Sequence, residues 1–273
     1  RRARGSELRA YPQVSVDGLQ FARSRQPART RPVANTSDNH IPSGVCEVGR
    51  MRLIAHRGFG GLYPENTLTA VESAAARADE ITVDVRRCDS GELVVIHDPT
   101  VDRVTDGSGA VCRHTLSELQ SLDVLDSGDH VPTLETVLAA VPPSVGITLE
   151  LHEVGLAADV LRLAKRADPQ VTVSSGIAHE LEGCRGIDPA VPRAYRFDGD
   201  PDPGLEFARE TDCRFLHPHA SVCEEWVVRA AHSEGMCVNA WGIDSRELSE
   251  RLAGRGVDGL IADCVEVLPR VEQ

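Results

Sequence analysis

From Met51 onward, short apolar and β-branched runs alternate with longer segments that have helical patterning. The runs that we expect to form strands are Arg52–Ala55, Glu80–Val85, Leu93–His97, Gly146–Leu151, Val171–Ser174, Ala194–Phe197, Arg214–His217, Met236–Trp241 and Gly259–Ile261. Regular alternation of this kind is typical of α/β folds with parallel strands. Eight main strands separated by helices within about 220 residues predict a closed TIM (β/α)₈ barrel.

Most of the predicted strands are separated by segments with helical periodicity: Asn66–Ala78, Leu134–Ala140, Val154–Arg166, Cys223–Ser233 and Ser245–Ala253. The exception is Gly91, which lies in a turn between Val83–Arg87 and Leu93–His97 and predicts a small hairpin or loop insertion after the second strand. A doubly wound open sheet is the alternative fold. Neither of the glycine-rich phosphate-binding motifs of such sheets occurs in the sequence, which favours the barrel.

The first 50 residues differ in charge from the rest of the chain. They carry nine Arg and four acidic residues, a balance of +5, whereas the remaining 223 carry 20 basic and 38 acidic residues, a balance of −18. The segment 23–39 is rich in Pro, Arg, Ser and Thr without any period, which predicts disorder. Because the first Met is Met51, we expect residues 1–50 to be an upstream extension or a dispensable tail, and residues 51–273 to form the barrel. A transit-like segment is the alternative.

Charge and hydropathy exclude several classes of partner. The net charge of −13 argues against nucleic acid or an anionic membrane surface as a partner. No run approaches the roughly 18 consecutive apolar residues of a membrane span. The start of the sequence lacks the pattern of a signal peptide, which predicts a cytoplasmic protein. No pattern specifies an oligomeric state.

Catalytic side chains of a barrel lie where its strands end and the following loops begin. The ends of the predicted strands and of the hairpin carry His56 and Arg57, Thr82 and Asp84, His97 and Asp98, Glu150 and His152, His217 and His219, and Trp241. Two histidines, an arginine and two carboxylates at separate strand ends predict a phosphate-ester site. The arginine would bind the phosphate, the carboxylates a divalent cation, and the histidines would transfer protons.

An ordered set of short motifs covers nearly the whole chain from Met51 to the C-terminus. The set comprises His56-Arg57-Gly58, Pro64-Glu65-Asn66-Thr67, Val83-Asp84-Val85, Gly91 followed by Val94-Val95-Ile96-His97-Asp98, Val131-Pro132-Thr133-Leu134-Glu135, Leu149-Glu150-Leu151, Val238-Asn239-Ala240-Trp241 and Gly256-Val257-Asp258-Gly259-Leu260-Ile261-Ala262-Asp263. In this order the motifs resemble the glycerophosphodiester phosphodiesterase family. Each fragment alone is weak, and the order makes the set specific.

The resemblance implies an enzyme on a TIM barrel that hydrolyses glycerophosphodiesters to an alcohol and sn-glycerol 3-phosphate with a bound Mg²⁺ or Ca²⁺. Carried over by position, the roles are general acid and base for His56 and His97, phosphate binding for Arg57, metal binding for Asp84 and Glu150, and pocket lining for Glu65 and Trp241. The chemistry is coherent, because cleavage of a phosphodiester needs charge neutralisation, a base for the attacking hydroxyl and an acid for the leaving alkoxide.

Two positions depart from the family pattern. Its Glu-x-Asp metal pair reads Thr82-Val83-Asp84 here, and its usual lysine is His152, which faces the substrate as a titratable group or a nitrogen ligand. Glu80 cannot replace the missing carboxylate, because four strand residues place it about 13 Å from Asp84. We therefore expect weaker metal binding. A catalytically weakened barrel that binds a phosphorylated ligand, or a related phosphodiesterase for a larger lipid headgroup, are the alternatives.

Several of these residues also have structural interpretations. One interpretation of Asp98 is that its role ends with shaping the turn before Pro99. We expect Asn66 and Thr67 to be helix caps, and Asp263 to cap the closing helix. For Glu65 the structural interpretation is a favourable interaction of its negative charge with the dipole at the start of the first helix. For Trp241 it is packing at the rim of the barrel. We expect the remaining pair, His217 and His219, to lie in a loop.

Overall fold

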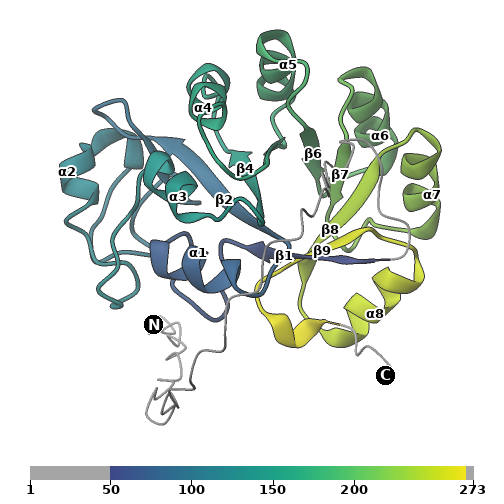
Figure 1. Ribbon diagram of the computed structural model, residues 1–273, viewed down its shortest axis with the longest axis horizontal. Coiled ribbons are helices and arrows are strands. Elements are labelled where there is room, and N and C mark those ends of the chain that lie inside the picture. The colour runs from purple at the N-terminus through teal and green to yellow at the C-terminus, as the bar shows by residue number, and fades with distance from the viewer. Residues whose placement is uncertain (1–49, 269–273) are drawn as a thin grey trace, which may run out of the picture. The chain divides into compact units, whose positions relative to one another are not determined.

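The computed structural model describes residues 50–268, so the expected leader lies outside the described residues apart from Arg50. Eight parallel strands form a barrel that closes where the first strand pairs with the second, as the alternation of the sequence predicts (Figure 1). The strands are β1 (Arg52–His56), β2 (Glu80–Arg87), β4 (Gly146–Leu151), β5 (Val171–Ser175), β6 (Arg193–Phe197), β7 (Phe215–Pro218), β8 (Cys237–Ile243) and β9 (Gly259–Ala262).

Helices cover the outside of the barrel (Figure 1). They are α1 (Leu68–Ala75), α3 (Leu134–Ala140), α4 (Ala157–Ala164), α5 (Ala178–Ile187), α6 (Pro201–Glu210), α7 (Glu225–Ser233) and α8 (Arg246–Gly254). The sequence patterns did not predict α5 and α6, because both contain glycine and α6 begins Pro-Asp-Pro. The Asp200 side chain accepts from the backbone N–H of Asp202, and Pro201 is tolerated in the first turn. Among the described residues, no helix is long and apolar enough to span a bilayer.

The predicted hairpin is present and opens a larger insertion. Strand β3 (Leu93–Val95) pairs antiparallel with β2, and Gly91 adopts a φ of +99° in the connecting turn. The chain then runs through a 3₁₀ turn, η1 (Val111–Arg113), and a short helix, α2 (Leu116–Leu119). These segments share a separate apolar cluster: Cys88, Val94, Ile96, Val101, Val104, Val111, Leu119, Val124 and Val131. The insertion therefore has its own small core beside the barrel.

Strand register brings the candidate carboxylates to one end of the barrel. Asp84 of β2 pairs with Glu150 of β4, two residues beyond the Thr82–Thr148 pair. Glu80 lies at the opposite end of β2, where its carboxylate pairs with Arg52 and accepts a hydrogen bond from Thr148. As the strand spacing required, Glu80 belongs to a structural ion pair and does not reach Asp84.

A buried carboxylate joins two neighbouring helices. Helix α4 has no side-chain cap of its own at Leu156. Glu180 of α5, which is buried, accepts hydrogen bonds from the backbone N–H groups of Gly155, Leu156 and Ala157 at 2.5, 3.0 and 2.9 Å. These N–H groups have no partner within the first turn of α4, so Glu180 supplies the missing cap from outside.

We expect Glu180→Ala to lower the free energy of unfolding by about 1–3 kcal/mol, because the buried N–H groups of α4 lose their acceptor. Denaturant unfolding followed by circular dichroism measures the change. Glu182→Ala on the same helix is the matched control, since Glu182 is exposed. Equal stability of the two variants would contradict the capping role.

Candidate active site

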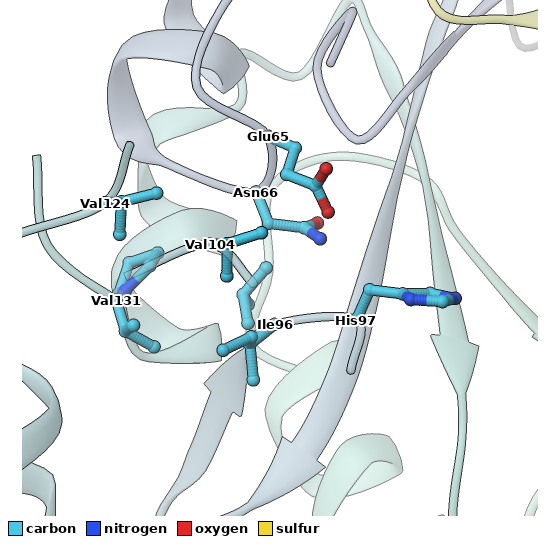
Figure 2. Close-up of a pocket in the computed structure, with 9 residues that line it drawn as sticks. Glu65, Asn66, Ile96, His97, Val104, Val124 and Val131 are labelled. Atoms are coloured by element: carbon cyan, nitrogen blue, oxygen red, sulfur yellow. The ribbon is translucent and has the colours of Figure 1, made fainter. Parts of the chain in front are cut away.

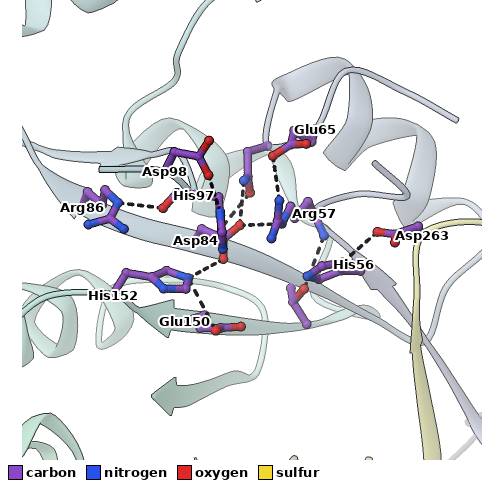
Figure 3. A network of polar contacts seen from close by, with 12 residues as sticks. His56, Arg57, Glu65, Asp84, Arg86, His97, Asp98, Glu150, His152 and Asp263 are labelled. Atoms are coloured by element: carbon purple, nitrogen blue, oxygen red, sulfur yellow. Dashed lines mark hydrogen bonds and ion pairs between the residues drawn. The ribbon is translucent and has the colours of Figure 1, made fainter. Parts of the chain in front are cut away.

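The strand-end residues named from the sequence converge at the C-terminal ends of β1, β2 and β4, beside the start of the insertion. Figure 3 shows, around a common centre, His56 from β1 and Arg57 directly after it, Asp84 from β2, His97 from the segment after β3, Glu150 from β4 and His152 directly after that strand. The carboxyl ends of parallel strands meet at the same edge of a barrel, so residues far apart in the sequence become neighbours there.

Asp84 is the centre of this network. Its carboxylate is 2% exposed, and Oδ1 lies 2.6 Å from Nε2 of His152. Oδ2 accepts a hydrogen bond from Nδ2 of Asn66 at 2.8 Å and lies 3.0 Å from Nε of Arg57. Burial opposes ionisation, but the bond to His152 and the charge of Arg57 hold the pKa of Asp84 well below its usual range. Asp84 is therefore a buried, ionised group.

Asn66 makes two hydrogen bonds with Asp84. Its Nδ2 donates to the carboxylate, and its Oδ1 accepts from the backbone N–H of Asp84 at 3.2 Å. The expectation that Asn66 caps the first helix is thus wrong, whereas Thr67 does cap α1 by accepting from the N–H of Ala70. Asn66 has a φ of +61°, a conformation that asparagine tolerates better than most residues. Its amide ties the loop before α1 to β2.

Arg57 lies between two carboxylates. Its Nη1 donates a hydrogen bond to Glu65 at 2.8 Å, whereas Nε pairs with Asp84 by charge alone, without the geometry of a hydrogen bond. Burial opposes its charge, but Asp84 and Glu65 hold the pKa of Arg57 above its ordinary value. The backbone of Arg57 has a φ of +53°, and Gly58 follows at +75°. A Cβ at Gly58 would approach the carbonyl carbon of Ala70 to 2.7 Å, so the turn that points Arg57 inward requires glycine.

His97 is oriented by the carboxylate that follows it. Its Nδ1 lies 2.6 Å from Oδ1 of Asp98, and Arg103 of the insertion contacts Asp98 at 2.5 Å and both oxygens of Glu65 at 2.7 and 2.9 Å. Hydrogen bonding from Arg103 lowers the pKa of Asp98 to about 2. Burial, the largest cause, lowers the pKa of His97. Asp98 therefore positions a histidine, a role beyond shaping a turn.

His56 has an equivalent carboxylate partner. Its Nδ1 lies 2.7 Å from Oδ1 of Asp263, at the end of β9. The expected capping role of Asp263 is wrong, because the following 3₁₀ turn, η2 (Val265–Val267), begins after Cys264 and has no side-chain cap. Burial opposes the charge of Asp263, but His56 holds its pKa below the ordinary value. An ionised carboxylate only accepts, so Nδ1 of each histidine carries the hydrogen and Nε2 is left for the site.

Glu150 has a partner that the sequence did not suggest. Its Oε1 lies 3.0 Å from Nε of Arg196, on β6, and 3.5 Å from Nε2 of His152. The guanidinium carbon of Arg196 lies 3.6 Å from the centre of the Trp241 ring, a cation–π geometry. The only signal for Arg196 in the sequence is a basic residue next to the end of a predicted strand.

Trp241 and the neighbouring histidines, His217 and His219, make specific contacts that the sequence did not predict. Trp241 donates from Nε1 to the carbonyl of His217 at 3.0 Å and packs against the edge of His219. His217 belongs to β7, and its side chain lies between Ser174 and Asn239. Burial lowers the pKa of His217 to about 3, so it is a neutral core residue, and the expectation of a loop position for it is wrong.

The donor atoms at the centre suit a divalent cation. One ligand atom each from Asp84, His97 and His152 lies within 4.8 Å of the others, and the rings of the two histidines meet edge-on with centroids 4.9 Å apart. Carboxylate oxygen and imidazole nitrogen are both common ligands of divalent ions, and the share of nitrogen exceeds that preferred by Mg²⁺ or Ca²⁺. Thr82 contributes its hydroxyl elsewhere, accepting from the backbone N–H of Arg57 at 3.3 Å.

Two hollows adjoin the network. The first is lined by His56, Thr82, Glu150, Arg196, His217, Trp241 and Ile261. The second, shown in Figure 2, has Glu65, Asn66 and His97 at one side and is otherwise lined by apolar residues, among them Ile96, Val104, Val124 and Val131. The first hollow is lined mainly by polar side chains, Glu150 among them, whereas the second belongs mostly to the insertion.

Comparison with known proteins agrees with this geometry. A sequence model described as the glycerophosphoryl diester phosphodiesterase family matches residues 56–267. A glycerophosphodiester phosphodiesterase of Caldanaerobacter subterraneus subsp. tengcongensis is 30% identical over 231 residues, which cover 79% of this chain and 95% of that protein. The sequence match thus spans the barrel and the insertion.

Solved structures extend the similarity. An Oleispira antarctica phosphodiesterase, determined in complex with the product sn-glycerol-3-phosphate, is 28% identical with a TM-score of 0.73, covering 78% of this chain and 92% of that chain. A glycerophosphodiester phosphodiesterase from Agrobacterium tumefaciens is 25% identical with a TM-score of 0.71, covering 80% and 99%. Barrel and site define a phosphoric diester hydrolase. The chain belongs to the glycerophosphoryl diester phosphodiesterase family.

The contact between Asp98, His97 and Arg103 predicts a pH-dependent stability. The pKa of Asp98 is lowered from 3.8 to about 2 in the folded protein, so its ionised form contributes stability that is present above about pH 4 and lost as the pH falls toward 2. We expect Asp98→Asn to lower Tm at pH 6, and the difference from the parent to shrink between pH 4 and pH 2. Asp126→Asn, at an exposed position of the same insertion, is the control. A difference that does not change with pH would contradict this assignment.

Proposed function

We propose that this protein hydrolyses glycerophosphodiesters to an alcohol and sn-glycerol 3-phosphate, with His56 and His97 as the general acid and base. The observation that supports it best is the pair of imidazoles held by Asp263 and Asp98 at 2.7 and 2.6 Å. Each carboxylate holds its ring in one tautomer and orientation, which is what proton transfer at Nε2 requires. The activities of the relatives, a glycerophosphodiester phosphodiesterase and a phosphodiesterase bound to the product sn-glycerol-3-phosphate, support the same substrate class.

In this mechanism one imidazole accepts a proton at Nε2 from the attacking hydroxyl, which is that of water in the net reaction. As the new bond from oxygen to phosphorus forms, the bond to the leaving alcohol breaks, and the other imidazole donates its proton to that oxygen. His97 suits the role of base, because its pKa is lowered by burial and its neutral form predominates at neutral pH. His56, whose Nδ1 is held by Asp263, is then the acid.

Arg57 is proposed to bind the phosphate. Its Nε and Nη1 face Asp84 and Glu65. These two contacts immobilise the guanidinium, and Nη2 has no bonded partner among residues 50–268. A guanidinium held by two carboxylates is already oriented before the substrate arrives, which reduces the entropy lost on binding. Glu65 and Trp241 would line the pocket, and His152 would face the phosphate from β4.

We further propose that Asp84 and Glu150 hold a divalent cation, Mg²⁺ or Ca²⁺ by family resemblance. His152 adjoins both carboxylates, at 2.6 and 3.5 Å, and adds a nitrogen donor. A bound cation would neutralise charge that develops on the phosphate oxygens. With Thr82 in place of a carboxylate, the oxygen ligand set is incomplete. This supports weaker metal binding than the family pattern implies, and a weakened barrel that only binds a phosphorylated ligand is the alternative.

Hydrolysis of glycerophosphocholine, followed by release of sn-glycerol 3-phosphate with Mg²⁺ or Ca²⁺ present, tests the proposed activity. Because each imidazole transfers a proton, we expect His56→Ala and His97→Ala to lower kcat by about 10²–10⁴-fold. His179→Ala is the control, since that histidine is exposed on α5. Turnover by His56→Ala at the rate of the parent would refute the mechanism.

Restoring the missing carboxylate tests the metal assignment. We expect Thr82→Glu to bind Mg²⁺ or Ca²⁺ more tightly than the parent does, measured by isothermal titration calorimetry, because a third acidic oxygen ligand is added on the strand that carries Asp84. Thr82→Gln, which has the same shape without the charge, separates the effect of charge from that of bulk. A Thr82→Glu protein that gains neither affinity nor rate would argue against a cation at this position.

A further inference from the structure

Arg196 is a positive charge in the active-site pocket that none of the sequence motifs contains. It lies on β6 and lines the same hollow as His56 and Thr82. Its side chain is 25% exposed, which is more open than the 15% of Arg57. The hollow therefore presents a permanent cation from β6.

The contacts of Arg196 leave most of its donors available. Among the described residues, only Nε has a charged partner, Oε1 of Glu150 at 3.0 Å, and the flat face of the guanidinium rests on Trp241 at 3.6 Å. Within the part of the chain that the structure describes, Nη1 and Nη2 have no bonded partner. They are also not among the buried polar atoms without a partner, so solvent reaches them. A guanidinium held by one edge and one face presents its other edge as a two-pronged donor, the geometry that matches phosphate.

The charge balance of the pocket favours an anion beside Arg196. Thr82 places a neutral hydroxyl in this lining, so Glu150 is its only carboxylate, and Arg196 already neutralises it. Arg57 is engaged by two carboxylates, Asp84 and Glu65. The positive charge of Arg196 is thus balanced by one carboxylate, whereas that of Arg57 is balanced by two. Arg196 therefore attracts an entering phosphodiester more strongly.

We propose that Arg196 is a phosphate-binding residue of this site, donating from Nη1 and Nη2 to non-bridging oxygens of the substrate, with Glu150 and Trp241 as its positioning residues. The proposal rests on the proposed function for the identity of the diester, but the binding of phosphate itself can be measured without turnover. A purely structural Arg196, whose role ends with neutralising Glu150, is the competing interpretation that the experiment must separate.

Titration of the full chain with sn-glycerol 3-phosphate and with inorganic phosphate, in chelator and without added divalent cations, gives the affinity directly. We expect Arg196→Gln to raise the Kd for both ligands by about 10- to 100-fold, the range for the loss of hydrogen bonds to a charged group. Arg196→Lys should retain part of the affinity, because it keeps the charge without the fork. Arg214→Gln is the matched control, since Arg214 also lies over an aromatic ring, that of Phe215, at 5.5 Å and outside the hollow.

The double variant Glu150→Gln/Arg196→Gln separates direct binding from charge neutralisation. If Arg196 only neutralises Glu150, removing both charges restores the affinity of the parent, and the proposal is overturned. If Arg196 binds phosphate, the double variant stays as weak as Arg196→Gln, with the Tm of each variant confirming folding. A parent that binds neither ligand also overturns it. Arg196-dependent binding without turnover of any glycerophosphodiester would instead refute the proposed function and leave this inference standing.

Discussion

The buried negative charge of Asp84 is the constraint on which the rest of the site depends. An ionised carboxylate that is 2% exposed is tolerated only if its oxygens are hydrogen-bonded and its charge is balanced. Arg57, Asn66 and His152 meet that requirement from three different segments. Two of them, Arg57 and Asn66, do so with positive φ angles, a backbone strain that the contacts around Asp84 maintain. The loop between β1 and α1 has its shape because Asp84 needs these donors.

A second layer of carboxylates connects this centre to the histidines and to the insertion. Asp98 and Asp263 each hold one imidazole, and Arg103 joins Asp98 to Glu65, which in turn holds Arg57. Through Arg103 the insertion thus contacts both the carboxylate that holds His97 and the carboxylate that holds Arg57. Val101 and Val104, close to Arg103 in the chain, belong to the small apolar core of the insertion, so a segment outside the barrel alternation is tied to the candidate site.

Positive charge in the pocket resolves an apparent conflict in a strongly acidic barrel. Residues 51–273 carry a balance of −18, yet the site is proposed to receive an anionic diester. The acidic residues at the mouth are paired: Asp84 with Arg57 and His152, and Glu150 with Arg196. Local pairing at short distance governs what a ligand meets, because the charges elsewhere on the surface are screened over about 10 Å. Thr82, which stands where the family pattern has a carboxylate, further reduces the negative charge that an anionic ligand meets in the pocket.

The sequence alone determined the barrel, the hairpin after the second strand and most of the catalytic candidates, because strand and helix periodicities are local and parallel strands all end at one edge. It also excluded Glu80 from the site, since distance along a strand follows from residue count. Tertiary structure decided which side chains meet: Asp263 lies 207 positions from His56, and Arg196 on β6 reaches Glu150 on β4 across the one strand between them, β5. Asn66 turned to Asp84 instead of capping α1 for the same reason. Such pairings depend on barrel closure and on the direction of individual side chains, which no local pattern encodes.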